Sequence, residues 1–152
     1  MPTIEEAYDA YIKTRFPLPS EAQIVALEKR MQSSLPKDYR QFILEYNGGF
    51  FTEPIIPSTH EDRPRDRLTV LYGINASHPS ADLASDFNLA LFEDNMPVTV
   101  LPIGYTLMGN LLYMITHEED SGVVGMKLAL RDDYFILASD IASFFAMLQP
   151  RK

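Results

Sequence analysis

The sequence contains no cysteine and no tryptophan, and only 13 of its 152 residues are lysine or arginine. Without cysteine the chain cannot hold a disulfide framework, a zinc–thiolate site, an iron–sulfur cluster or a thiol nucleophile. No hydrophobic run approaches the ~20 residues that span a bilayer. The first residues also lack the positive and apolar regions of a signal peptide. We therefore expect a soluble, cytoplasmic protein.

The motifs of common catalytic and ligand-binding sites are also missing. The seven glycines show no dinucleotide-binding or P-loop spacing, and Gly104 and Gly109 are expected in a hairpin connection. The three histidines form no zinc-binding pair, and no serine stands in a nucleophile elbow. Residues 117–120 could hold a hard cation through oxygen atoms, but without calcium-loop spacing we interpret them as an acidic turn. We expect no catalytic residue, no cofactor and no bound metal.

What the sequence does contain is the composition of an ordinary globular domain with an excess of acid. Hydrophobic residues make up 46% and charged residues 22% of the chain, which is close to the globular average. The net charge is −8. An acidic surface repels phosphate backbones and anionic lipid headgroups, so neither nucleic acid nor a membrane is an expected partner. A basic protein remains a possible partner.

The negative charge is concentrated in the middle of the chain. Between Arg67 and Lys127 lie 59 residues without lysine or arginine, and seven acids there carry −7 of the net charge of −8. This stretch is either a solvated surface or a docking surface whose charge selects a basic protein. Tyrosine beside acid is typical of interfaces. We take the following as candidate partner-binding residues: Asp82, Asp86, Glu93, Asp94, Tyr105, Glu118, Glu119 and Asp120.

Helical signals dominate the first half of the sequence. Thr3 with Glu6, and Ser20 with Gln23, have the spacing of capping boxes, in which two orphan N–H groups are satisfied reciprocally. Asn47 and the two glycines after it are expected to end a helix in the left-handed conformation. Ser139 is expected to cap the last helix. The predicted helices cover residues 3–15, 20–31, 36–46, 82–94 and 139–148.

The second half reads mainly as short strands separated by polar turns, with a mixed-charge loop over residues 57–67 before them. The predicted strands cover residues 68–72, 98–103, 110–116, 123–128 and 134–137. Helices early and strands late favour an α+β fold over alternating βαβ units. We expect one domain over residues 1–152, with a mostly antiparallel, mixed-order sheet flanked by N-terminal helices and a C-terminal helix.

Several segments in order resemble one protein family. Residues 35–42 (LPKDYRQF) followed by Asn47-Gly48-Gly49 resemble the hallmark helix of the SUKH superfamily, the Smi/Knr-like proteins. Residues 71–73 (LYG), 101–104 (LPIG), 109–113 (GNLLY) and 138–148 (ASDIASFFAML) are similar to its later motifs, so the resemblance covers about residues 20–149. The chain departs from the family in lacking its tryptophan and in its apolar connection at residues 105–108.

This resemblance implies a single α+β domain and no catalytic residues. Many bacterial members are immunity proteins that neutralise a cognate toxin, often a nuclease, and the resemblance implies such a basic protein toxin as the partner. Some eukaryotic members are scaffold regulators of cell-wall synthesis, so a regulatory protein-interaction module is the alternative. An enzyme or metal-binding domain that uses residues 117–120 is a third hypothesis. The oligomeric state is left open by the sequence.

Overall fold

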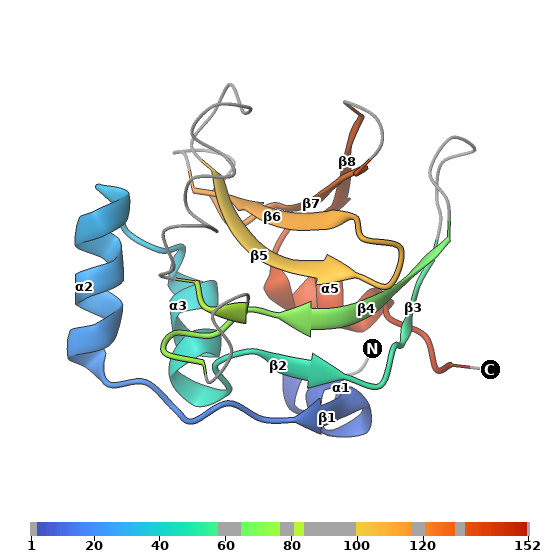
Figure 1. Ribbon diagram of the computed structural model, residues 1–152, viewed down its shortest axis with the longest axis horizontal. Helices are drawn as coiled ribbons and strands as arrows, with labels where there is room; N and C mark the ends of the chain where they lie inside the picture. Colours follow the sequence, from blue (N-terminus) through green and yellow to red (C-terminus); the bar gives the residue numbers. More distant parts are fainter. Residues whose placement is uncertain are drawn as a thin grey trace.

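The computed structural model of the chain describes residues 3–57, 65–76, 81–83, 100–116, 121–129 and 133–151, and it has the predicted α+β architecture (Figure 1). The helices are α1 (Ile4–Tyr11), α2 (Glu21–Met31), α3 (Lys37–Glu45) and α5 (Ile141–Met147). The strands are β1 (Ile12–Thr14), β2 (Gly49–Phe51), β3 (Ile55–Ile56), β4 (Asp66–Leu71), β5 (Val100–Thr106), β6 (Leu111–Ile115), β7 (Val124–Lys127) and β8 (Tyr134–Ala138).

Both predicted capping boxes are present at the helix starts. The Thr3 hydroxyl accepts a hydrogen bond from the Glu6 N–H at the start of α1, and Ser20 and Gln23 form the same arrangement at α2. The prediction for the last helix was wrong by one residue. Asp140, and not Ser139, caps α5 by accepting the Ser143 N–H at 2.7 Å, because only residue 140 stands three positions before that N–H.

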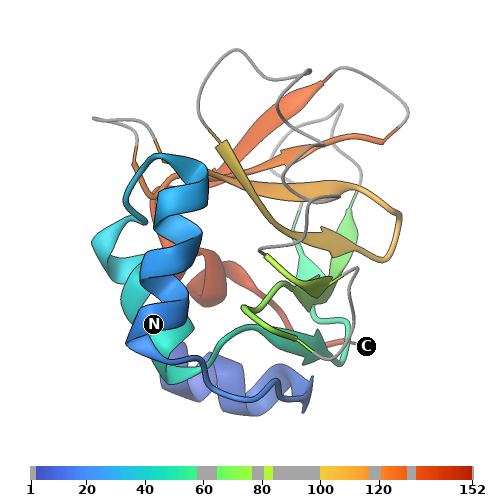
Figure 2. The same cartoon turned by 60° about the vertical axis from the view of Figure 1, so that its left-hand side comes forward.

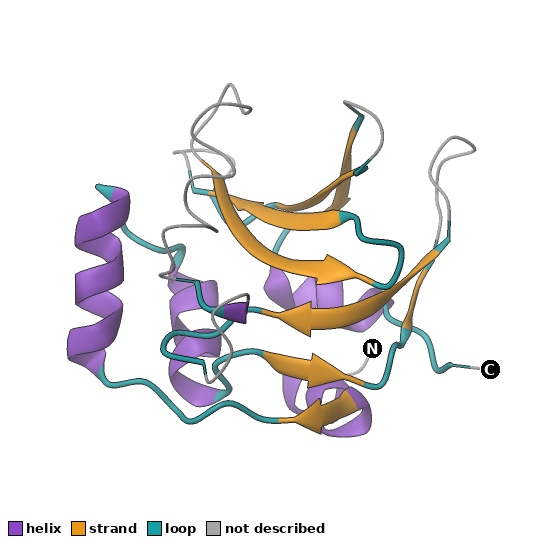
Figure 3. Ribbon diagram, in the orientation of Figure 1, coloured by secondary structure: helices purple, strands orange, loops and turns teal. Residues whose placement is uncertain are grey.

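The strands form a sheet in the order β1-β2-β4-β5-β6-β7-β8, with β3 pairing to β4. Every pairing between these strands is antiparallel. From β4 to β8 the spatial order follows the chain order, so the described strands of the second half form the predicted meander. Figure 3 shows these strands as neighbouring arrows across the sheet.

The N-terminal half is not purely helical, which corrects the sequence-based prediction. The first helix ends at Tyr11, because Ile12 takes an extended backbone with φ −70° and ψ 137°. The β-branched Ile12 and Thr14 then pair with β2. Strands of two or three residues, such as β1, β2 and β3, are too short to show a periodic pattern.

Three further predictions concern the pair Gly104 and Gly109, the end of α3, and two segments of the middle of the chain. Gly104 lies inside β5 and only Gly109 lies in the following turn, so the pair does not form a connection together. The left-handed end of α3 begins at Asn47 itself, with φ 56°, and continues in Gly48. Asp66 and Arg67 belong to β4, which corrects the loop predicted over 57–67, and Asp82 forms a bridge with Gly73 instead of starting the helix predicted over 82–94. The rest of that predicted helix, after residue 83, and residues 58–64 lie outside the described residues. No helix in the described part is long and apolar enough to cross a membrane.

The hydrophobic core lies between the sheet and helices α1, α3 and α5. The rings of Tyr8, Phe42 and Phe145, one from each helix, pack against one another, and Phe51 of β2 joins them. Figure 2 shows the helices gathered on one side of the sheet. We call the opposite surface of the sheet the outer face. Side chains that alternate with core residues along a strand point to this outer face.

Candidate functional site

Of the predicted partner-binding residues, Asp82 and Tyr105 lie in the described part, and both approach the end of β4. The Tyr105 ring lies 6.1 Å from the Tyr72 ring, measured between centroids. Gly73, the next residue, forms a bridge with Asp82, whose carboxylate accepts the Asn75 N–H at 3.3 Å. The others lie outside the described residues: Asp86, Glu93, Asp94, Glu118, Glu119 and Asp120.

Burial keeps three tyrosines, Tyr8, Tyr72 and Tyr113, in the neutral form at physiological pH by raising the pKa of each. Burial raises the pKa of Tyr72 to about 12, and burial also raises the pKa of Tyr113. The same cause raises the pKa of Tyr8 to about 12, and its hydroxyl donates to the Gly48 carbonyl oxygen at 2.6 Å. Burial disfavours the phenolate in each case, so these shifts do not prepare a general base.

The connection between β5 and β6 is an exposed apolar turn. Leu107 and Met108 are 54% and 55% exposed, although turn positions between strands usually carry polar residues. Their backbone is nevertheless fixed. The Leu107 N–H donates to the Arg67 carbonyl oxygen at 2.9 Å, and the Met108 N–H donates to the Asp66 carboxylate at 3.2 Å. The turn therefore presents two large apolar side chains to solvent on an anchored backbone.

A buried carboxylate supports this apolar turn. Asp66 begins β4, is 2% exposed, and also accepts the Arg67 N–H at 2.8 Å and the Asn110 Nδ2 donor at 2.9 Å. The Asn110 side-chain oxygen in turn accepts the Ala129 N–H at 3.0 Å. Satisfied buried polar groups of this kind restrict the backbone that they bind. The network ties β4, the turn and the segment after β7 together.

The outer face of β7 and β8 continues the apolar surface. Tyr113 is stacked on Gly125, where an added Cβ would lie 2.3 Å from a ring atom. Its ring meets Tyr134 edge-on at 6.4 Å between centroids, and the Lys127 amine lies 5.9 Å from the Tyr134 ring centre. Tyr134 and Ile136 are among the exposed large hydrophobic residues. Aromatic and apolar side chains next to a cation are enriched at protein interfaces.

The asparagine–glycine segment that resembles the family hallmark has a structural role. Asn47 is fully buried; its side-chain nitrogen donates to the carbonyl oxygens of Pro17 at 2.7 Å and Ile74 at 3.0 Å, and its oxygen accepts the Ile74 N–H at 2.7 Å. An added Cβ at Gly73 would lie 2.2 Å from the Asn47 carbonyl oxygen, and one at Gly48 would lie 2.3 Å from another carbonyl. These two motifs therefore pack against each other and leave no room for a ligand between them.

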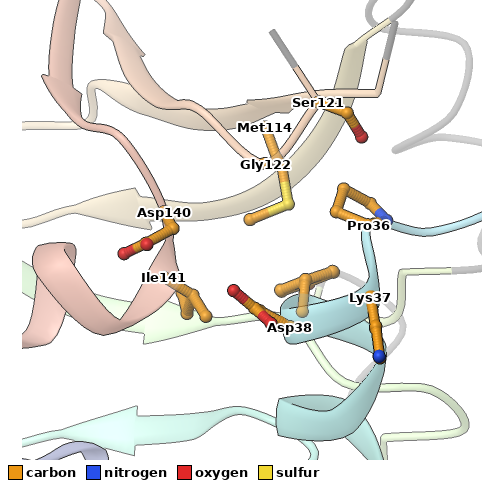
Figure 4. A pocket seen from close by; sticks show the side chains of 9 residues that line it. Pro36, Lys37, Asp38, Met114, Ser121, Gly122, Asp140 and Ile141 are labelled. Carbon is orange, nitrogen blue, oxygen red and sulfur yellow. The ribbon is translucent and has the colours of Figure 1, made fainter. Parts of the chain in front are cut away.

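A recess of about 240 Å³ lies between the start of α3, the start of α5 and the turn before β7 (Figure 4). Asp38 and Asp140 both line it, with Met114 between them. In Figure 4 the two carboxylates point in different directions, and Asp140 uses one oxygen to cap α5. Carboxylates that point apart do not share a proton between them, as a closely spaced acidic pair does.

The described residues contain no group of three or more histidine, aspartate or glutamate side chains placed to hold a metal ion. The acidic run at residues 117–120, the only cation site considered from the sequence, lies outside the described residues. The described polar clusters around Asn47 and Asp66 bind mainly backbone groups. These clusters hold the backbone in place, and the one around Asp66 fixes the exposed turn between β5 and β6.

Sequence reasoning singled out Tyr105 but missed Leu107, Met108 and Asp66. In the sequence, the apolar connection at residues 105–108 departs from the family pattern. This departure was the signal that could have indicated an exposed contact surface. Asp66 gave no such signal, because an acid next to a mixed-charge loop is normally solvated. Its burial follows from the pairing of β4 with β3 and β5, which brings the β5–β6 turn over it.

The fold and surface together define an α+β protein in which buried polar networks support the sheet, and an anchored apolar turn is available to another protein. The sequence model of the SMI1 / KNR4 family (SUKH-1) matches residues 18–147. The chain therefore belongs to this family, as the resemblance of its motifs predicted. Comparisons with curated proteins and with solved structures find no significant match.

Proposed function

We propose that the protein is a non-enzymatic, cytoplasmic immunity protein that binds and neutralises a basic toxin, of the nuclease kind. Its membership of the SMI1 / KNR4 family supports the coarse assignment. The single observation that carries the proposal is the placement of the apolar turn. Leu107 and Met108 are exposed within a 59-residue stretch of the sequence that has seven acids and no lysine or arginine. In the fold, the turn lies beside the start of β4, and Asp82 lies beyond the other end of that strand.

The acids and the apolar side chains of this stretch act on different steps of binding. The acids attract a basic partner over a distance of about 10 Å at moderate salt, which raises the association rate. Apolar side chains on a fixed backbone then lose water and little conformational freedom when they are buried, which slows dissociation. Tyr105 lies on β5, the strand that leads into the turn, and its ring partner Tyr72 directly follows β4. An acidic surface held over the nucleic-acid groove of a nuclease would exclude its substrate.

The direct test uses any toxin gene found beside the gene of this protein. Its toxin domain is expressed under an inducible promoter, with and without this chain, and growth and complex formation are measured. We expect the chain to restore growth and to co-purify with the toxin domain. If neither occurs with any neighbouring toxin, the immunity proposal is wrong, and a regulatory protein-interaction module of the cell-wall-regulator type becomes the better assignment.

A charge-reversal variant tests the acidic residues themselves. Replacing Glu118, Glu119 and Asp120 by lysine should slow association about tenfold and reduce its dependence on salt. The matched control reverses Glu5, Asp38 and Glu45, which are exposed on α1 and α3 and give the same change in net charge. Equal slowing by both variants would show that net charge acts, and not the position of these acids.

A further inference from the structure

A second recess lies at the opposite end of the sheet from β8. It has a volume of about 590 Å³ and is formed by β1, β2, β4 and the C-terminal segment. The C-terminal segment is held there by a bridge between Gln149 and Ile55 of β3, and Figure 1 shows it passing beside this strand. Lys13, Phe50, Thr69 and Arg151 contribute to the wall. Four segments that are distant in sequence therefore build one site.

This recess is cationic in a protein that is otherwise acidic. Arg151 forms an ion pair with Glu53 at 3.2 Å, so these two charges neutralise each other. Lys13, on the edge strand β1, has no ion pair among the described residues. The recess therefore has a surplus of one positive charge, while the whole chain carries −8. Salt screens the distant acids over about 10 Å, but it does not screen a group that contacts Lys13.

The recess also contains a hydroxyl group without a partner. The Thr69 Oγ1 atom is buried and makes no hydrogen bond, and no other described side chain has such an atom. Thr69 lies between the core residues Leu68 and Val70 on β4, so its side chain belongs to the outer face. Rotation about χ1 exchanges the hydroxyl and methyl positions. This rotation breaks no hydrogen bond, because the hydroxyl has no partner in its present position.

We propose that this recess binds a short peptide segment through its C-terminal carboxylate. Lys13 supplies the charge, Thr69 supplies a hydrogen-bond donor, and Phe50 with the threonine methyl groups supplies an apolar wall. The volume is far larger than an inorganic anion needs and is suited to two or three residues. The site is separate from the acidic stretch, so its failure would leave the proposed function untouched.

The test is a titration of the full-length, ¹⁵N-labelled protein with N-acetyl-Ala-Ala-Ala that carries a free C-terminal carboxylate. The same peptide with a C-terminal amide and inorganic phosphate are the two comparison ligands. We expect saturable shifts at Lys13, Thr14, Thr52 and Thr69 with the carboxylate peptide, and about tenfold weaker binding of the amide. No shift up to about 20 mM, or equal binding of acid and amide, would overturn the proposal.

Phosphate separates a peptide site from a simple anion site. If phosphate binds the same residues as tightly as the carboxylate peptide, the recess is an ion site only and the peptide proposal is wrong. Lys13→Gln should weaken peptide binding about tenfold and Thr69→Val about threefold. Lys29→Gln on α2 is the matched control and should leave binding unchanged. Unchanged binding in Lys13→Gln, with an unchanged protein spectrum, would contradict the proposal.

Discussion

Two buried polar side chains, Asn47 and Asp66, hold two very different regions of this molecule. Each is at most 2% exposed and takes part in three hydrogen bonds. Asn47 fastens the end of α3 to Ile74 after β4, which is buried, and to the carbonyl oxygen of Pro17. Asp66 binds the buried Asn110 side chain and fastens the β5–β6 turn, whose Leu107 and Met108 side chains are exposed.

This difference separates the residues that identify the family from those suited to bind a partner. The Asn47 region consists of motif residues whose close backbone contacts require asparagine and glycine. The Asp66 region presents Leu107 and Met108, which depart from the family pattern. A fold can thus keep an invariant packing arrangement in one place and vary a supported surface in another. The following predictions test this division, beginning with the largest effect on stability.

Asn47→Ala should lower the free energy of unfolding by about 4 kcal/mol, because it removes hydrogen bonds from the buried N–H and carbonyl groups of Ile74 and from the Pro17 carbonyl. Urea denaturation followed by circular dichroism measures the change. Asn75→Ala is the matched control, since Asn75 has the same φ of 56° and is exposed. That control should lose only about 1 kcal/mol, from backbone strain. Similar losses of unfolding free energy in both variants would show that the hydrogen bonds of the Asn47 side chain do not cause the loss.

Gly73→Ala should cost about 3 kcal/mol in the same assay, because its Cβ would lie 2.2 Å from the Asn47 carbonyl oxygen and force the backbone apart. Gly109→Ala provides the comparison. Gly109 has φ 81° and no atom within 4 Å of an added Cβ, so only conformational strain of about 1 kcal/mol is expected. A larger loss at Gly109 than at Gly73 would contradict the close packing of the two motifs.

Asp66→Ala should cost about 2 kcal/mol, since two of its three donors, the N–H groups of Arg67 and Met108, are only partly buried and can regain some hydration. It should also increase amide hydrogen exchange at Met108 and Arg67, whose backbone N–H groups donate to the carboxylate. Exchange at Asn47 should stay unchanged in this variant. Unchanged exchange at Met108 would show that the carboxylate does not anchor the turn.

Leu107→Ser combined with Met108→Ser should have the smallest effect on stability, within about 0.5 kcal/mol, because both side chains are already exposed to water. Thermal unfolding by calorimetry is a suitable measurement. A loss above about 2 kcal/mol would mean that the turn packs against the body of the protein. Leu18→Ser, at another exposed leucine, is the control.

Local sequence signals predicted a large part of the fold. The capping boxes of α1 and α2, the end of α3 at Asn47 and the meander from β4 to β8 follow from contacts within a few residues or from period-two patterns. Strands β1 and β2 could not be predicted, because their stability comes from pairing with segments about 20 to 40 residues away. The burial of Asp66 depends on such pairing as well.

The sequence predicted less of the candidate site than of the fold. Charge counting located the acidic stretch, and the structure brings Asp82 and Tyr105 toward the end of β4. The exposure of Leu107 and Met108 is not a local property, because it depends on how β5 and β6 are registered. The recess near Lys13 joins four distant segments and has no sequence signature at all.

The central claim is that the turn at Leu107 and Met108 contacts the partner, while the region around Asn47 supports the fold. The most direct measurement is the dissociation constant of the Leu107→Ser, Met108→Ser variant for the neighbouring toxin domain, by titration calorimetry. The account predicts at least tenfold weaker binding, equivalent to about 1.4 kcal/mol, with an unchanged unfolding temperature. A dissociation constant equal to that of the unaltered protein would contradict it.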